Sequence, residues 1–148
     1  MEKSPSDVIS ELAKEVGIMK PSTRVFEVDP PKLPEVIKKL VEMYGAERVF
    51  VSTIVGIDRP QQGVIEVDVF VEVLGFKEVY CLKLEVPRDN PRVPSIVDIV
   101  PSALVGELEV HDLLGVVFEG NVYLRRPVFV PEEIAAKGVY PLRKDFKG

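Results

Sequence analysis

Apolar residues in the first part of the chain recur at helical spacing. They are Val8, Ile9, Leu12 and Val16, which would share one face of a helix. Ser4 or Ser6 can cap the beginning of this helix, and Gly17 would end it. After it, apolar and polar residues alternate over residues 24–29, which predicts a strand.

A second helix is predicted to begin after Asp29. Pro30 and Pro31 follow this residue, and proline is tolerated in the first turn of a helix because the backbone donors there lack partners anyway. The helical period then runs through Val36, Ile37, Leu40, Val41 and Tyr44. Gly45 is the residue type that commonly ends a helix.

The middle of the chain predicts β-structure. Residues 48–57 are rich in Val, Ile and Phe, and residues 64–74 and 77–86 alternate. Segment 58–63, DRPQQG, has turn composition, and short connections favour antiparallel pairing. In the central run, Ile65, Val67, Val69, Val71 and Val73 face one way, and Val64, Glu66, Asp68, Phe70 and Glu72 face the other. We therefore expect an α+β fold, an antiparallel sheet meander whose apolar face is covered by helices and whose other face is largely solvated.

The last third of the chain is interrupted by prolines. A helix is predicted over residues 101–114 with Gly115 at its end, and a short one over residues 131–137. Residues 116–148 otherwise lack periodicity, and irregular segments of this length are commonly either disordered or packed on a partner. We expect a single domain with a compact part, residues 1–115, and an extended C-terminal docking segment, residues 116–148.

The charge balance restricts the partners. The net charge of −5 argues against a protein whose main task is to bind nucleic acid. Residues 119–148 carry a net charge of +2, so a mildly basic tail follows an acidic body. Such a tail is a plausible docking device, or it is simply solvated. Thirteen prolines and few Asn and Gln side chains are typical of a thermophilic source.

The composition also predicts a chain without a metal or cofactor of its own. Cys81 is the single cysteine and His111 the single histidine, so an internal disulfide or a Cys/His metal framework cannot form. No glycine-rich nucleotide-binding motif is present. The apolar runs are shorter than a membrane span, and the N-terminus has no apolar signal region. These features predict a cytoplasmic protein that reaches the membrane only through partners.

The densest polar cluster lies on the predicted helix at residues 107–112. Glu107 and His111 share a face by their spacing, as do Glu109 and Asp112. One interpretation is a small stand-alone enzyme that uses these four side chains for acid–base chemistry. A metal site would need further ligands from elsewhere in the chain.

The other interpretation of this cluster is structural. Arg125 and Arg126 follow the helix closely and can fold back onto its acids, since the guanidinium group suits paired contacts with carboxylates. The acids and arginines would then fix a turn of the chain, or bridge to another protein.

The same region carries a resemblance to a known family. Residues 107–126 contain the pattern E-x-E-x-x-D-L-L-G-x-x-F-x-G-x-x-x-L-R-R, preceded by Pro-Ser-Ile at 94–96 and followed by PLRKDF at 141–146. This order and spacing resembles the C-type, or 30 kDa, subunit family of respiratory complex I (NADH-quinone oxidoreductase), which includes the equivalent subunit of membrane-bound [NiFe] hydrogenases.

The resemblance implies a non-catalytic subunit that lacks a redox cofactor. Its partners would be the large D-type subunit (49 kDa or [NiFe]-hydrogenase-like) and other subunits of the hydrophilic arm of a complex I-like complex. The complex would lie at the cytoplasmic side of the membrane. We expect the partner interface to be formed or shaped by Glu107, Glu109, Asp112, Arg125, Arg126, Arg143 and Asp145.

Four positions depart from the family pattern. Leu108 stands where the family usually has arginine, and Val105 where tryptophan is common. Residues 120–122 read Gly-Asn-Val in place of Gly-His-Pro. These changes suggest a divergent member of archaeal or hydrogenase type.

Overall fold

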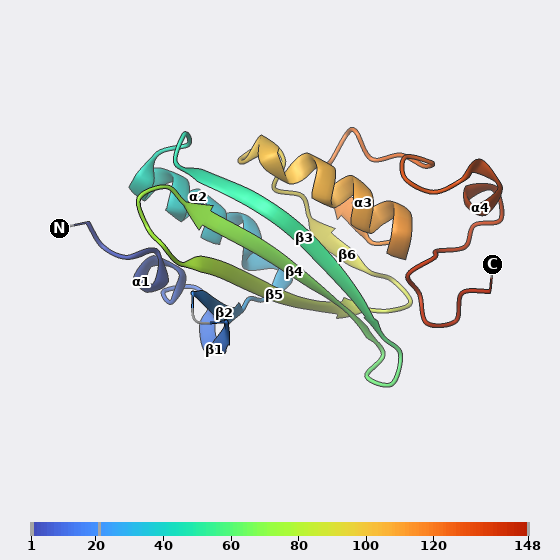
Figure 1. Ribbon diagram of the computed structural model, residues 1–148, viewed down its shortest axis with the longest axis horizontal. Coiled ribbons are helices and arrows are strands. Elements are labelled where there is room, and N and C mark those ends of the chain that lie inside the picture. Colours follow the sequence, from blue (N-terminus) through green and yellow to red (C-terminus); the bar gives the residue numbers. More distant parts are fainter. Residues whose placement is uncertain (1, 21, 148) are drawn as a thin grey trace.

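A computed structural model describes residues 2–20 and 22–147 of the chain. Figure 1 shows a twisted sheet with helices behind it and beyond one edge, and a long C-terminal segment at one end. The elements in order are α1 (Pro5–Ile9), β1 (Lys14–Lys20), β2 (Thr23–Glu27), the 3-10 turn η1 (Pro30–Lys32), α2 (Leu33–Tyr44), β3 (Val49–Arg59), β4 (Val64–Val73), β5 (Val79–Pro87), β6 (Arg92–Pro94), the 3-10 turn η2 (Pro101–Ala103), α3 (Leu104–Leu114), β7 (Val117–Glu119) and α4 (Glu132–Ala136). The predicted α+β class is confirmed.

The main sheet has the strand order β1-β2-β5-β4-β3. Strands β3, β4 and β5 form the predicted antiparallel meander. Strand β2 pairs with β5 in parallel, and β1 pairs antiparallel with β2 at the edge. A second, two-stranded parallel sheet joins β6 to β7, which the sequence did not predict. It ties the proline-rich stretch to the chain that follows α3.

The first predicted helix was too long. Ser4 caps it as expected, but α1 ends at Ile9, and Val16 and Gly17 lie in strand β1. Val16 is 44% exposed, so the apolar stripe assumed for this helix is not buried as a unit. Pairing with β2 over Lys14–Lys20 outweighs the local helical periodicity, as tertiary context commonly does.

Helix α2 follows its sequence signals closely. It is preceded by the double proline, and its C-cap Gly45 has a φ of 95°, a conformation that favours glycine. Its apolar stripe joins the core, which includes Val36, Ile37 and Leu40. Burial of each such side chain stabilises the fold by about 1.5–3 kcal/mol.

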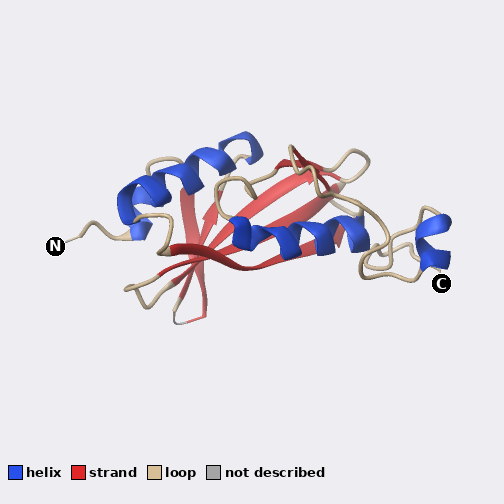
Figure 2. Cartoon of the chain, turned by 90° about the horizontal axis from the view of Figure 1, so that it is seen from above, coloured by secondary structure: helices blue, strands red, loops and turns tan. Residues whose placement is uncertain are grey.

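The sheet has one face in the core. The alternating residues of β4 predicted for this face, from Ile65 to Val73, are all buried. The two long helices, α2 and α3, pack on this side of the sheet (Figure 2). The prediction for the other face was partly wrong, because Glu66 and Asp68 are also buried there. Lys83 lies opposite Asp68 on the neighbouring strand, and its Nζ lies 3.8 Å from Glu66 Oε1.

Helix α3 lies between two layers of the chain. On one side it packs closely on β3: a Cβ added at Gly106 would lie 2.9 Å from Ile54, and one added at Gly56 would clash with Leu114. On the other side it carries buried acids that contact the C-terminal segment. Gly115, with a φ of 81°, ends the helix as predicted. The described residues contain no helix that is long and apolar enough to span a membrane.

Candidate functional site

Glu107 holds the chain on both sides of helix α3. Its Oε1 accepts hydrogen bonds from Ser95 Oγ at 2.6 Å and from Asn121 Nδ2 at 2.9 Å. Its Oε2 accepts from the backbone N–H of Ile96 at 2.9 Å. One carboxylate therefore connects the loop after β6 to the turn after β7.

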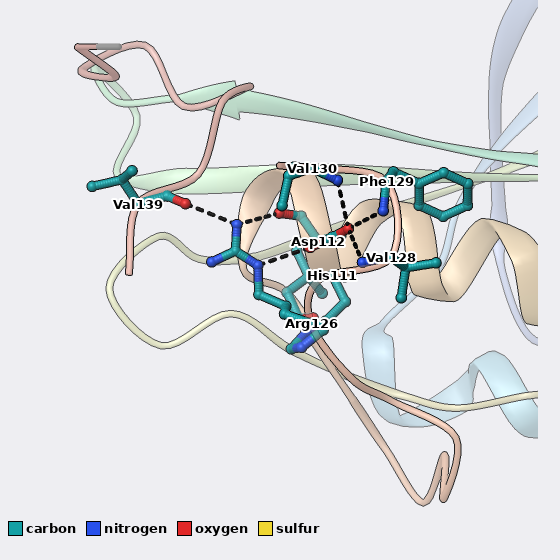
Figure 3. A network of polar contacts seen from close by, with 8 residues as sticks. His111, Asp112, Arg126, Val128, Phe129, Val130 and Val139 are labelled. Atoms are coloured by element: carbon teal, nitrogen blue, oxygen red, sulfur yellow. Dashed lines mark hydrogen bonds and ion pairs between the residues drawn. The ribbon is translucent and has the colours of Figure 1, made fainter. Parts of the chain in front are cut away.

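Asp112 holds the next part of the C-terminal segment. Its Oδ2 accepts hydrogen bonds from three consecutive backbone N–H groups, those of Val128 at 2.8 Å, Phe129, and Val130 at 3.1 Å. Its Oδ1 accepts from Arg126 Nε at 2.9 Å. Figure 3 shows the three backbone donors on one side of the carboxylate and Arg126 on the other. The backbone donors are bound whatever side chains their residues carry.

Arg126 extends this network to the chain beyond α4. Its Nη2 donates to the backbone carbonyls of Asp112 and Val139, both at 2.8 Å. The guanidinium also lies over the ring of Tyr140, 4.3 Å from its centroid, a favourable cation–π contact. Of the two arginines expected to fold back, only Arg126 does so. Arg125 is exposed, and within residues 2–20 and 22–147 it makes no ion pair.

A third acid, Asp58 of β3, holds the end of the segment. Arg88 binds its two oxygens with a paired contact at 2.6 and 2.9 Å. Asp58 Oδ2 also accepts from the backbone N–H of Lys144 at 2.8 Å. Arg88 Nη2 reaches Asp145 at 3.2 Å, so the PLRKDF stretch is fixed by two successive residues.

The C-terminal end of α3 binds the same stretch. Arg143 Nε donates to the Leu114 carbonyl at 2.8 Å, and the Leu142 N–H donates to the Leu113 carbonyl at 3.0 Å. Carbonyls in the last turn of a helix lack partners within the helix, and a cation is favourable there. The predicted residue Arg143 thus caps the helix within the chain.

The ionisation of the acids follows from their surroundings. Burial raises the pKa of Asp112, but the hydrogen bonds from Phe129, Arg126, Val128 and Val130 outweigh it, and its pKa lies below the ordinary value. The pairing with Arg88 lowers the pKa of Asp58. Burial raises the pKa of Glu107 in spite of its three donors. Asp112 and Asp58 are therefore ionised at neutral pH.

The seven predicted interface residues divide into two groups. Glu107 and Asp112 are buried, and Arg126 and Arg143 are half-buried, all in contacts within the chain. Glu109, Arg125 and Asp145 are exposed. The first group shapes the path of the C-terminal segment, and the second group is accessible to another protein.

The geometry does not suit the alternative of a stand-alone active site. Glu107 is 1% and Asp112 0% exposed, and the chain's own donors bind both carboxylates. His111 Nδ1 lies 2.8 Å from the Val116 carbonyl oxygen. A hollow of about 520 Å³ opens between residues 10–14 and the strands β2 and β5, and none of the four proposed catalytic residues lines it. A smaller hollow of about 110 Å³ between β3 and α3 is lined by one of the four, Glu109. Among the described residues no group of three or more His, Cys, Asp or Glu side chains is arranged to hold a metal ion.

Sequence reasoning missed Asp58, Arg88, Ser95 and Asn121. Ser95 was noticed only as part of the Pro-Ser-Ile tripeptide, and Asn121 only as a departure from the family pattern. Asp58 was assigned to the turn, whereas it is the penultimate residue of β3. In the structure Asp58 has almost no exposure, and a buried acid requires a partner. The sequence alone does not show that this residue is buried.

The fold and the site together define a class of protein. It is a small α+β domain whose irregular C-terminal segment is held on the surface of the molecule by buried acids. These acids are buried and are not accessible to a substrate. The chain belongs to the family described as the 30 kDa subunit of respiratory-chain NADH dehydrogenase, whose family model matches residues 26–148. It is thus a member of a family of subunits of multi-subunit respiratory complexes.

Two relatives show the range of this family. The C-type subunit of the F420H2 dehydrogenase of Methanosarcina mazei is 30% identical over 138 residues, which is 93% of this chain and 84% of that protein. NADH-quinone oxidoreductase subunit 5 of Thermus thermophilus is 34% identical over 108 residues, which is 66% of this chain and 50% of that protein. The aligned part thus spans half the length of the Thermus relative.

Two solved structures share the fold. A chain of the membrane-bound sulfane sulfur reductase, an archaeal respiratory membrane complex, superposes with a TM-score of 0.79 at 26% identity, covering 96% of this chain and 82% of that one. A trypsin-resistant fragment of Nqo5 gives a TM-score of 0.64 at 23% identity, covering 80% of this chain and 95% of the fragment. The second likeness concerns the fold alone.

Proposed function

We propose that the chain is a non-catalytic docking subunit in the hydrophilic arm of a complex I-like oxidoreductase. Its principal partner is the large D-type subunit, of the 49 kDa or [NiFe]-hydrogenase-like kind, and the docking element is the C-terminal segment, residues 116–148. The chain then lies on the cytoplasmic side of the membrane, held there by the other subunits. Family membership supports the assignment to such a complex.

The observation that carries the docking role is the opposite orientation of backbone and side chains in this segment. Two buried acids, Asp58 and Asp112, bind its backbone, and a third, Glu107, binds the side chain of Asn121. Four of its large apolar side chains are nevertheless exposed: Val122 by 85%, Tyr123 by 54%, Phe129 by 47% and Leu142 by 52%. A segment with a fixed backbone and exposed apolar side chains has the features of a protein–protein interface whose partner is not bound.

The first residues of the segment also support the docking role. Val116 and Phe118 are 0% and 2% exposed and belong to the core, so the segment is anchored where it begins. Because its path is already fixed, docking does not require ordering of a loose tail, which would cost binding free energy. The exposed charges of Arg125, Glu109 and Asp145 lie where they can form the polar rim of the interface.

The test compares two pairs of surface substitutions in full-length protein. Val122→Ser with Phe129→Ser removes apolar groups from the segment, and Ile18→Ser with Met43→Ser removes similarly exposed groups elsewhere. Burial of each apolar side chain contributes about 1.5–3 kcal/mol. The first pair is therefore expected to weaken the Kd for the large subunit by about a hundredfold or more, and the second to leave it unchanged.

The binding partner in this measurement is the large subunit encoded alongside the chain, co-expressed and purified. Both variants should keep the thermal unfolding midpoint of the wild type, because none of the four side chains is buried. Equal recovery of the large subunit with all three proteins would refute the docking role of the segment. A chain cut at Gly115 is a poorer tool, since it also removes the core residues Val116 and Phe118.

A further inference from the structure

Among the residues that the structure describes, no helix packs on the second face of the main sheet. Both long helices, α2 and α3, pack on the core face, and in Figure 1 the strands β3, β4 and β5 turn their other face toward the reader. We call this the open face. By strand register its residues are Phe50, Thr53, Val55, Ile57 and Arg59 of β3, Val64, Glu66, Asp68, Phe70 and Glu72 of β4, and Val79, Cys81, Lys83 and Glu85 of β5.

Asp68 lies near the middle of the open face without a counter-charge. It is only 4% exposed, and its Oδ1 has no hydrogen-bond partner. Both nearby cations bind its neighbour instead: Arg59 contacts Glu66 at 2.9 Å and Lys83 contacts Glu66 at 3.8 Å. Within residues 2–20 and 22–147, no basic side chain lies within ion-pair distance of Asp68. The protonated Asp68 side chain hydrogen-bonds to Glu66, but its ionised form is costly unless a cation pairs with it.

The surroundings of Asp68 have the character of an interface. Half-buried apolar side chains, among them Ile57 and Phe70, and the 40% exposed Val55 lie along the same face. The charged groups on this face are Glu66 and Glu72 of the same strand and Arg59, Lys83 and Glu85 of the neighbouring strands, which together with Asp68 leave an excess of acid. Apolar groups around a recessed acid fit a partner surface that is apolar and carries a cation.

We propose that the open face is a second docking surface, distinct from the C-terminal segment, and that its occupant is a basic segment of another subunit that places a Lys or Arg side chain on Asp68. This proposal rests on the proposed function in one respect, that the chain is part of a complex. It does not depend on which subunit binds residues 116–148.

Protonation of Asp68 gives the docking a specific pH dependence. Burial and the neighbouring Glu66 carboxylate raise the pKa of Asp68 to about 7 in the isolated chain. A partner cation binds only the ionised form, so docking must release this proton. The affinity therefore falls as the pH drops below about 7, by up to about tenfold per pH unit, and is level above it.

The first test uses cysteine labelling. Cys81 is 0% exposed and burial raises its thiol pKa to about 12, so it does not react with a maleimide at neutral pH. Val55→Cys on the open face and Met43→Cys on α2 then each provide one exposed reporter thiol. In the intact complex, co-purified with the subunits encoded alongside, Val55→Cys should react at least tenfold more slowly than in the isolated chain. Equal rates in the two states would overturn the proposal.

A photo-crosslinker on the same thiol identifies the occupant. A benzophenone maleimide on Val55→Cys should capture a segment of another subunit with more Lys and Arg than Asp and Glu. Capture of an acidic segment, or of a second copy of this chain, would refute the assigned partner. Met43→Cys serves as the control for capture from any nearby surface.

The second test replaces the acid itself. Asp68→Asn keeps the shape of the protonated carboxyl, so the isolated chain should fold, with an unfolding midpoint no lower than that of the wild type. Its affinity for the remaining subunits should be at least tenfold weaker at pH 8 and independent of pH between 6 and 8. Glu85→Gln, an exposed acid on the same face, should change the affinity less than threefold. An unchanged affinity for Asp68→Asn would exclude the cation contact, whereas loss of binding by the Val122→Ser with Phe129→Ser variant concerns only the C-terminal segment.

Discussion

The backbone N–H of Lys144 donates a hydrogen bond to Asp58 Oδ2 at 2.8 Å, across 86 positions of the chain. Asp58 is the penultimate residue of β3 in the main sheet, and Arg88, which directly follows β5, binds the same carboxylate. The PLRKDF stretch is thus joined to the sheet by a polar contact. We expect Asp58→Asn to release this stretch while the core remains folded.

Amide hydrogen exchange measures this release. In Asp58→Asn the backbone amide of Lys144 should exchange about tenfold faster. The neutral side chain of the variant no longer forms a charged pair with Arg88 and is a weaker acceptor for the Lys144 N–H. The amides of Val128 and Val130, which bind Asp112, should keep their wild-type rates. Faster exchange at all three would indicate that the segment unfolds as one unit.

Asp112→Asn is expected to be the most destabilising single change at the site. It leaves Arg126 without its carboxylate and places an NH2 group or a weaker acceptor against three backbone donors. Removal of one partner from a buried charged pair costs about 3–5 kcal/mol, which should appear in the free energy of unfolding from urea denaturation. Glu109→Gln, an exposed acid on the same helix, should change this free energy by less than about 0.5 kcal/mol.

The pH dependence of Asp112 has a definite sign. Its folded-state pKa is lowered, so its contribution is complete above the ordinary aspartate pKa of about 3.9 and is lost as the pH falls through the lower folded value. Acid titration of the wild type should therefore lose stability below about pH 4. If Asp112→Asn loses as much stability as the wild type there, another group is responsible.

Asp68 should act in the opposite direction. Its folded-state pKa is raised to about 7, so the unfolded chain ionises first and the folded state loses stability as the pH rises from about 4 to about 7. Asp68→Asn lacks this loss. The isolated variant should melt higher than the wild type at pH 7.5 and by a smaller margin at pH 5.5, measured by calorimetry. A constant margin would mean that Asp68 is ionised in the folded chain throughout this range.

Two glycines separate backbone strain from side-chain contact. Gly115 and Gly120 both have positive φ values, 81° and 93°, but only at Gly115 would a Cβ meet a neighbour, the Tyr140 ring at 2.9 Å. Gly120→Ala should cost about 1–2 kcal/mol through the left-handed conformation alone. Gly115→Ala should cost more and should also shift the Tyr140 ring, visible in its aromatic NMR signals. Equal costs would mean that the ring moves aside freely.

The elements that the sequence predicted well are bounded by local signals. Helix α2 has prolines at its start and Gly45 at its end, and the meander strands alternate over long runs, so neighbours along the chain determine both. The first helix was predicted too long because the competing partner of Lys14–Lys20 is strand β2, a tertiary pairing. The parallel pairing of β6 with β7 involves three residues on each strand, too few for a recognisable period.

The site was predictable where its residues form a compact motif. Glu107, Asp112 and Arg126 lie within one pattern, and the structure brings the last two into contact. Asp58 and Arg88 lie far from that pattern, and nothing local distinguishes them from ordinary solvated charges. Arg125 and Arg126 are adjacent and chemically identical, and only the folded path of the chain decides that Arg126 turns inward.

The way Asp112 binds residues 128–130 has a consequence for how such a surface can change. The carboxylate recognises three backbone amides, a feature that every residue except proline supplies. The one exposed side chain among them, that of Phe129, is therefore exchangeable without altering the route of the main chain. In such a scaffold the backbone contacts determine where the contact surface lies, and the exposed side chains determine what it binds. The same fold can therefore adapt to different neighbouring proteins by substitutions at its exposed positions alone.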